Sequence, residues 1–450
     1  MPEQSSSRTC QPESASISFG EAWLFWLKLG FISFGGPAGQ IALMHHELVE
    51  RRRWISERRF LHALNYCMLL PGPEAQQLAT YMGWLMHRTF GGIVAGGLFV
   101  LPSLLILIAL SWIYVVFGNT PIVTAVFSGI KPAVVAIVAV AAYRIGTRVL
   151  RNATLGSIAA AAFIAIAALH WPFPAVIAVA GVVGYLGGKL APARFAGAIA
   201  HQTIGNYGPA IIDDDTPPPA YAQFRWQRVI TVFSCAAVLW IGALGTLFLL
   251  QGPSGTLTQM GWFFSKAALV TFGGAYAVLP YVYQGAVDRH GWLTTLQMMD
   301  GLALGETTPG PLIMVVAFIG FVGAWGHAPP EFISPPVAGV LGALTVTYFT
   351  FLPSFVFIFL GAPIIEGTRT HAALNAVLTT ITAAVVGAIV NLALFFGYHV
   401  LWPQGFNGGF QWSSAFIALI GFVVLLRFKS GIIPVILASG VAGIVLRLVS

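Results

Sequence analysis

Long apolar runs, separated by short polar or charged stretches, follow one another along almost the whole chain. Runs long enough to cross the roughly 30 Å hydrocarbon core of a bilayer as helices recur from one end to the other, and about thirteen segments can be delimited in this way. They lie near residues 17–38, 57–88, 90–117, 121–148, 153–170, 174–192, 229–251, 258–285, 294–326, 334–361, 370–398, 411–427 and 431–448. The pattern predicts an all-α integral membrane protein.

The apolar pattern occurs twice. Helix breakers, a tryptophan and a lysine recur at one spacing of 238 residues (34 to 272). The matched positions are Phe34-Gly35-Gly36 with Phe272-Gly273-Gly274, Pro71-Gly72-Pro73 with Pro309-Gly310-Pro311, Trp54 with Trp292, and Lys28 with Lys266. Beyond an insertion near 326–336, Pro102-Ser103 matches Pro353-Ser354 at a spacing of 251 residues (102 to 353). Duplicated halves in an apolar chain are typical of transporters, whose substrate site lies where the repeats meet. A duplication retained for packing alone is the weaker alternative, because the matched residues are not core aliphatics.

The repeat divides the chain into five parts. They are a polar N-terminal tail (1–16), a first transporter repeat (17–192), a polar linker (193–228), a connecting transmembrane span (229–257) and a second transporter repeat (258–450). The linker contains three consecutive aspartates (213–215) and three consecutive prolines (217–219), which predict an extended, solvated connector.

Two segments in each half are not plain spans. Segments 57–88 and 294–326 carry Pro-Gly-Pro in the middle, and segments 17–38 and 258–285 contain Phe-Gly-Gly near or at their ends. Two prolines remove two backbone donors and glycine permits any turn, so a continuous helix cannot pass through. Discontinuous, re-entrant helices that line a polar cavity are the favoured interpretation, and a simple proline kink is the alternative.

The placement of lysine and arginine predicts the topology. If the broken segments are re-entrant and the N-terminus is cytoplasmic, the loop cations fall on the cytoplasmic side in both halves, except Arg289 and Arg447. This requires the halves to be inverted relative to each other, with a periplasmic C-terminus. If all thirteen segments crossed the membrane fully, both termini would stay on the predicted sides, but arginines 51–53 would lie outside.

The composition excludes several classes of protein. The chain is 57% hydrophobic and only 8% charged, whereas a soluble domain carries roughly a quarter charged residues. The net charge of +7 does not indicate a nucleic-acid partner, because the arginines lie in short loops. Three scattered cysteines argue against disulfides and a cysteine metal site, and no phosphate-binding loop or hydrolase triad is present. We therefore expect neither an enzyme nor a bound metal or cofactor.

Three lysines lie inside apolar segments: Lys28, Lys131 and Lys266. Burying an ammonium group in hydrocarbon costs about 2.5–3.5 kcal/mol or more, so such lysines are functional candidates. Lys28 and Lys266 are related by the repeat and would suit a small dianion. The alternative is that they extend to the membrane interface. For Lys131, whose repeat partner is Thr382, both interpretations stand equally.

The helix breaks supply a second device for binding an anion. Half-helices that start at Pro73 and Pro311 would present free N–H groups and the positive end of a helix dipole. The predicted substrate-binding residues, besides the two lysines, are Gly35, Gly36, Gly72, Pro73, Gln76, Gln77, Gly273, Gly274, Thr307, Thr308, Gly310 and Pro311.

For the acidic and histidine residues near the breaks, the sequence predicts different roles and positions. Glu306 and Glu74 are candidate proton carriers, and the alternative for Glu74 is an acid that complements the helix dipole. Asp300 is expected at the membrane interface. His45 and His46 fall in the basic loop after the first break and are expected to be solvated.

These motifs resemble a known family. The runs Phe34-Gly35-Gly36-Pro37 and 70–79 (LPGPEAQQLA) resemble the first half of the chromate ion transporter family. Residues 271–276 (TFGGAY) and 306–311 (ETTPGP) resemble its second half. The resemblance implies a bacterial inner-membrane exporter of chromate, of the long type that carries both halves in one chain and gives chromate resistance.

Physical reasoning supports export and leaves alternatives open. A dianion that leaves a negative-inside cell releases about 4.6 kcal/mol per 100 mV. Uptake or exchange of sulfate, another tetrahedral dianion, is the second hypothesis, and a non-transport role is the third. The expected partners are chromate, with sulfate as the alternative substrate, and the lipid bilayer. Whether the chain forms a homodimer is left open.

Overall fold

The computed structural model describes most of the chain. The described residues are 17–34, 36–195, 207–214, 216, 221, 225–272, 274–327, 334–365, 372–428 and 430–449. Within them the structure is helical, and an isolated β-bridge between Ile55 and Ile212 is the only strand-like pairing. The N-terminal tail, Gly35, Gly273, most of the linker, and the loop cations Arg369 and Lys429 lie outside the described residues.

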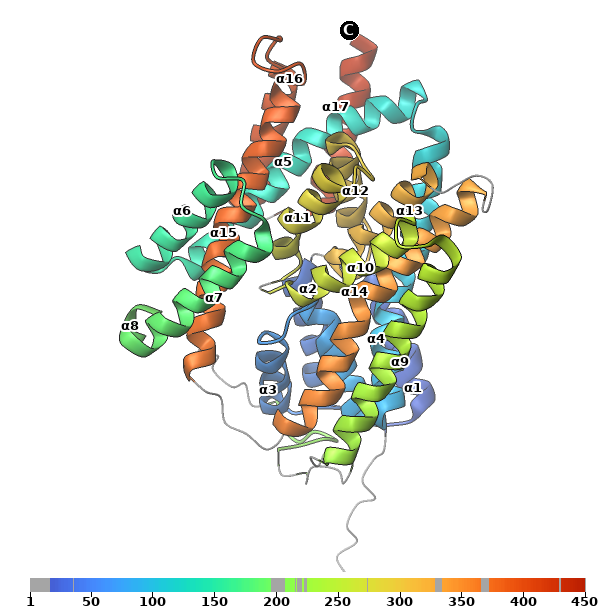
Figure 1. The fold of residues 1–450 in the computed structure, drawn as a ribbon, viewed down its shortest axis with the longest axis vertical. Helices are drawn as coiled ribbons and strands as arrows, with labels where there is room; N and C mark the ends of the chain where they lie inside the picture. Colours follow the sequence, from blue (N-terminus) through green and yellow to red (C-terminus); the bar gives the residue numbers. More distant parts are fainter. Residues whose placement is uncertain are drawn as a thin grey trace, which may run out of the picture.

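Among the described residues, nine elements precede α9 (Trp226–Gln251), and the last of them lies at the start of the linker. They are α1 (Phe19–Ile32), α2 (Gly36–His45), the π-helical turn η1 (His46–Arg51), α3 (Glu57–Cys67), α4 (Glu74–Phe117), α5 (Pro121–Val149), α6 (Ala153–Ala167), α7 (Phe173–Leu190) and the short α8 (Pro192–Phe195). Figure 1 shows α1 and α3 in the lower part of the molecule, α2 near its middle, and α6–α8 at its left side.

A single helix, α9 (Trp226–Gln251), leads to the second half. That half contains α10 (Thr256–Leu269), α11 (Ala275–Tyr283), η3 (Gln284–Arg289), α12 (Thr295–Thr307), η4 (Leu312–Met314), α13 (Val315–His327), α14 (Pro335–Ile365), α15 (Ala372–Leu401), α16 (Trp412–Arg427) and α17 (Ile432–Val449). The C-terminal end of α17 lies at the upper end of Figure 1, opposite α1.

The helices have the length and composition of membrane spans. Seven described helices are long and apolar enough to cross a bilayer: α4, α5, α7, α9, α14, α15 and α17. Many of their large apolar side chains are exposed on the outside of the bundle, as expected for surfaces that face lipid. The chain is therefore an all-α integral membrane protein, as the apolar pattern predicted.

The two halves repeat in backbone structure as well as in sequence. The starts of η1 and η3 and of α3 and α12 are 238 residues apart (46 to 284, 57 to 295), and those of α5 and α15 are 251 apart (121 to 372). Left-handed backbone recurs too, at Gly36 and Gly274 and at Gly72 and Gly310. The conformations that only glycine adopts easily are thus duplicated with the helices.

Both predicted Pro-Gly-Pro breaks are present. In the first half α3 ends at Cys67 and α4 begins at Glu74; in the second, α12 ends at Thr307 and η4 begins at Leu312. The predicted separation between segments 57–88 and 90–117 corresponds to a kink in α4. There His87 and Arg88 leave the helical conformation, and Arg88 has a φ of 58°.

Packing joins the halves into one bundle. Helix α14 packs against α4, and α15 packs against α5, α6 and α7, so the long helices of each half contact those of the other. One buried apolar cluster is formed mainly by the second half with α5–α7, and another by α1–α4 with the end of α14. Helix α9 buries none of its residues and lies along α14 and α10 (Figure 1).

The described part of the linker is attached to the first half. Ile211 N donates to Arg53 O (2.9 Å) and Ser56 Oγ donates to Asp214 Oδ1 (2.6 Å). The linker is extended here, as predicted, but Tyr207, Ile211 and Ile212 pack on the first half's apolar cluster. The expectation of a fully solvated connector is therefore wrong for residues 207–214.

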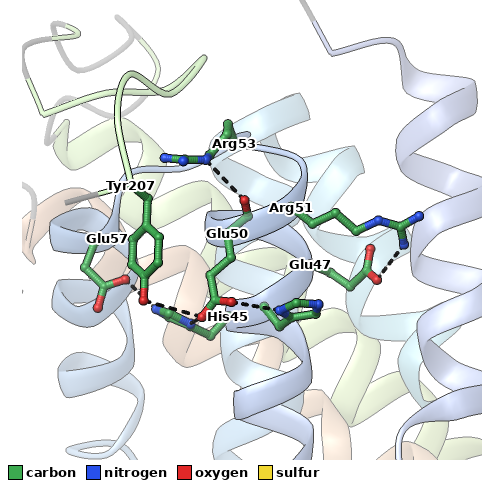
Figure 2. A network of polar contacts seen from close by, with 8 residues as sticks. His45, Glu47, Glu50, Arg51, Arg53, Glu57 and Tyr207 are labelled. Atoms are coloured by element: carbon green, nitrogen blue, oxygen red, sulfur yellow. Dashed lines mark hydrogen bonds and ion pairs between the residues drawn. The ribbon is translucent and has the colours of Figure 1, made fainter. Parts of the chain in front are cut away.

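The basic loop also contains more structure than expected. Figure 2 shows His45 between the carboxylates of Glu50 and Glu57, with Tyr207 from the linker beside them. The His45 side chain is 20% exposed, so its expected solvation is wrong, whereas His46 is 59% exposed. Hydrogen bonding to His46, together with the charges of His45 and His46, holds the pKa of Glu50 below its usual value. The physical reason is that α2 and η1 extend the helix through the region that the sequence suggested as loop.

Candidate functional site

The breaks of the two halves meet and pair reciprocally. Gly72 N donates to Thr271 O (2.7 Å), and Gly310 N donates to Ser33 O (2.8 Å). Gly72 and Gly310 are equivalent in the repeat, as are Ser33 and Thr271, which precede the two Phe-Gly-Gly breaks. Each Pro-Gly-Pro break therefore donates a backbone hydrogen bond to the residue that precedes the Phe-Gly-Gly break of the other half. A pair of contacts of this kind is the signature of an approximate two-fold axis.

Glycine is required at the centre of this crossing. Gly72 has a φ of 126° and Gly310 a φ of 99°, where a side chain is strained. A Cβ atom on Gly72 would lie 2.5 Å from Ser354 Oγ, and one on Gly310 would lie 2.8 Å from Ser103 Cβ. Ser103 and Ser354 are themselves equivalent, so each break packs on the Pro-Ser step of the opposite half.

Buried polar atoms without partners surround the crossing. Gln40 donates to Gly310 O and to Ser33 O, Gln77 Nε2 donates to Pro71 O (2.7 Å), and Gln76 Nε2 donates to Thr80 Oγ1 (3.0 Å). The remaining polar atoms have no hydrogen-bond partner among the described residues: Oε1 of Gln40, Gln76 and Gln77, and the hydroxyls of Ser33, Ser103 and Ser354. Buried polar groups are normally paired, so this concentration marks a place for a polar ligand or water.

Two helix starts contribute backbone donors to the same region. The residue before α4 is Pro73 and the one before η4 is Pro311, and neither provides a side-chain cap. The first N–H groups of such segments have no intrahelical acceptor. They favour an anion through hydrogen bonds and through the helix dipole.

The hydroxyl groups of Thr307 and Thr308 donate hydrogen bonds within the last turn of α12, so these protons are already in use. Thr307 Oγ1 donates to Leu304 O (2.9 Å), and Thr308 Oγ1 donates to Gly305 O (3.0 Å). Next to them, Glu306 accepts a hydrogen bond from Tyr276, which follows the second Phe-Gly-Gly break. Glu74 lies in the first turn of α4 and is half-buried.

One cation near this region was not singled out in the sequence. Arg144 of α5 interacts electrostatically with Tyr276 and donates to Leu425 O (2.9 Å). The sequence grouped it with the loop arginines, because nothing in its local pattern indicates that its charge acts on Tyr276.

The repeated lysines lie away from the buried crossing. Lys28 is exposed on the face of α1 that also exposes Leu24 and Phe31. Lys266 is half-buried, lies 5.3 Å from the centre of the Trp262 ring and interacts electrostatically with Arg289 at the end of η3. These surroundings favour the interfacial position that was the alternative for both lysines.

Asp300 is buried inside the bundle, and its expected depth at the membrane interface stays a prediction. Its carboxylate is buried on α12, where it contacts Lys131 and Tyr114. These partners, one of them 186 residues away in the chain, offset the cost of burying the charge. The same contact places Lys131 inside the bundle.

Paired halves that cross at broken helices within an apolar bundle define the class of membrane transporters. The chain belongs to the chromate transporter family, whose profile matches residues 20–185 and 258–444. It is 30% identical to the chromate transport protein of Cupriavidus metallidurans over 421 residues, covering 92% of this chain and 90% of that protein. It is also 30% identical to the chromate transport protein of Pseudomonas aeruginosa over 450 residues, covering 98% and 96%. No solved structure matches the chain significantly.

Proposed function

We propose that this protein exports chromate from the cytoplasm across a bacterial inner membrane and thereby gives chromate resistance. Membership of the chromate transporter family supports the substrate. Export is electrically favourable, since a dianion leaving a negative-inside cell releases about 4.6 kcal/mol per 100 mV. Membrane potential and the proton gradient are the proposed driving forces.

The reciprocal crossing of the breaks is the observation that carries this proposal. It brings two uncapped helix starts and the hydroxyls of Ser33, Ser103 and Ser354 into one buried region. Hydroxyl and backbone donors can surround a tetrahedral oxyanion without a metal. The site we propose comprises Gly36, Gly72, Pro73, Gln76, Gln77, Gly274, Thr307, Thr308, Gly310 and Pro311, with Gly35 and Gly273 outside the described residues and Glu74 and Glu306 as proton-coupling candidates.

Flux into proteoliposomes tests the function directly. The purified chain should take up radiolabelled chromate when an inside-positive potential is imposed, and flux should fall when the potential is collapsed. Unlabelled sulfate in excess should compete only weakly if chromate is the preferred ion. Equal competition, together with sulfate uptake, would support the alternative of sulfate transport, and absence of any anion flux would refute a transport role.

The same proposal includes inverted halves with a cytoplasmic N-terminus. In a variant whose natural cysteines are replaced, single cysteines at Arg52 and Arg427 should both be protected from an impermeant thiol reagent in intact cells. A cysteine at Arg289 should be labelled, which provides the positive control. The physical reason is that loop arginines are retained in the cytoplasm. Labelling at position 52 from outside would refute the re-entrant arrangement of the first half.

The lysines are proposed to attract the dianion at the entrances of the pathway. The exposure of Lys28, and the partial exposure of Lys266 near Arg289, support this role over direct contact at the crossing. The double variant Lys28→Gln, Lys266→Gln should raise the apparent KM for chromate about threefold to tenfold at low salt, with kcat nearly unchanged, because steering acts on encounter. The KM of the variant should depend less on salt than that of the parent.

A matched control is Lys189→Gln, which removes another lysine that lies over an aromatic ring, 4.3 Å from the centre of Tyr185. This control should leave KM unchanged. A large loss of kcat in the double lysine variant would instead assign the lysines to the binding site itself.

A further inference from the structure

An ion pair between α5 and α12 connects the two halves. Lys131 Nζ lies 3.6 Å from Asp300 Oδ2, and Tyr114 donates a hydrogen bond of 2.9 Å to the same oxygen. The Asp300 side chain is 5% exposed and that of Lys131 is 22% exposed. Tyr114 is in turn packed against the rings of Phe127 and Phe318, so the pair has apolar surroundings.

The second carboxylate oxygen of Asp300 is unused. Oδ1 is buried and has no hydrogen-bond partner in the part of the chain that the structure describes. A buried carboxylate normally uses both oxygens, because each unpaired one carries a desolvation cost. This oxygen is therefore available to accept a proton while Oδ2 stays with its two partners.

The pair is asymmetric, unlike the crossing of the breaks. Lys131 and Tyr114 belong to the first half and Asp300 to the second. Their repeat equivalents are Thr382, Ile365 and His62, which cannot form the same contact. Within the described ranges, every other ion pair lies inside the first half. Asp300 and Lys131 thus provide the charged contact between the two units expected to move during transport.

The neighbouring elements supply no competing charge. Helix α12 packs against α4, α5, α13, α15 and α17, and against η4, whose three residues are apolar. Lys131 from α5 and Tyr114 from α4 act on Asp300, and no charged group from the described residues of α13, α15 or α17 does so. The ionisation of Asp300 therefore determines whether Lys131 has a counter-charge.

We propose that Asp300, in addition to the candidates Glu74 and Glu306, is a carboxyl that proton coupling requires, and that Lys131 is the cation that links its charge to movement between the halves. With Asp300 ionised, the pair holds α12 to α5. A proton taken from water at Oδ1 neutralises the carboxylate and leaves Lys131 as an unpaired ammonium, so the attraction between the halves is lost. Release of the proton on the other side restores the pair. This proposal rests on the proposed chromate transport.

The test compares single and double neutralisation in the reconstituted full-length protein. Two rates are measured: exchange of labelled chromate at equal concentrations with no gradient, and net chromate flux driven by an imposed pH gradient. Asp300→Asn or Lys131→Gln alone should lower both rates about tenfold or more, because each leaves a buried group without its partner. The double variant should recover exchange to within about threefold of the parent, since no unpaired charge remains.

Net flux in the double variant is the deciding readout. It should no longer respond to the pH gradient, whereas Asp288→Asn, which neutralises an exposed acid of η3, should respond like the parent. A double variant that keeps the pH response would show that the pair is only structural. A double variant that remains monodisperse but does not recover exchange would refute compensation between the two charges. If the parent moves no chromate, the proposed function fails; if it moves chromate without a pH response, only the coupling proposal fails.

Discussion

Gly72→Ala and Gly310→Ala should each reduce chromate flux about tenfold or more while the chain still inserts into the membrane. Alanine is strained in the left-handed backbone conformation of these glycines, at a cost of about 1–2 kcal/mol. A change of about 1.4 kcal/mol in an activation free energy corresponds to a tenfold change in rate. The added Cβ would also approach Ser354 or Ser103 of the opposite half. Flux per inserted molecule in proteoliposomes is the measurement.

A matched control is available in α4. Gly97→Ala adds the same methyl group to a helical glycine with nothing within 4 Å of the new atom. It should leave flux unchanged. Normal transport by both break variants would mean that the crossing is a packing feature that tolerates a small shift.

Ser103→Ala combined with Ser354→Ala should impair transport without destabilising the protein. Both hydroxyls are buried and lack a partner in the described residues, so their removal costs the folded state no hydrogen bond. A hydrogen bond to a charged group is worth about 1.5–3 kcal/mol, so loss of each donor should raise the KM for chromate about tenfold to a hundredfold. Thermal unfolding in detergent should occur at the same or a higher temperature.

Ser111→Ala separates the two effects. Ser111 lies on the same helix, is fully buried and also lacks a partner, but it is two turns beyond Ser103. Its removal should change neither KM nor stability by much. An equal loss of transport in the Ser111 variant would show that the crossing hydroxyls have no special role.

The sequence predicted the breaks because proline and glycine act on the backbone where they stand. Pro-Gly-Pro interrupts a helix whatever surrounds it, so α3, α4 and α12 end or begin within a few residues of the expected positions. The equivalence of the halves was also visible, since it needs only a spacing. Which surfaces of equivalent segments touch is not encoded in a spacing, and the bond from Gly72 to Thr271 could not be foreseen.

The charged residues were harder to place, for a physical reason. The sequence alone does not reveal that Asp300 is buried inside the bundle, because the partners that offset the cost of its burial come from elsewhere in the chain. Lys131 and Tyr114 do so from α5 and α4, and no local pattern reveals them. The exposure of Lys28 shows the converse, since a long side chain in an apolar segment can reach the outside of the bundle.

The proposed role of helix α9 depends on the number of times the chain crosses the membrane rather than on buried side chains. It is 26 residues long and apolar, yet it buries none of its side chains. If the halves are inverted, as we propose, and each crosses the membrane an even number of times, the segment between them must cross it an odd number of times. An unrelated apolar helix of similar length should therefore replace α9, whereas a hairpin of two spans should reverse the second half. A single crossing of this kind would allow the fusion of two half-length ancestors into one chain without any redesign of their shared interface.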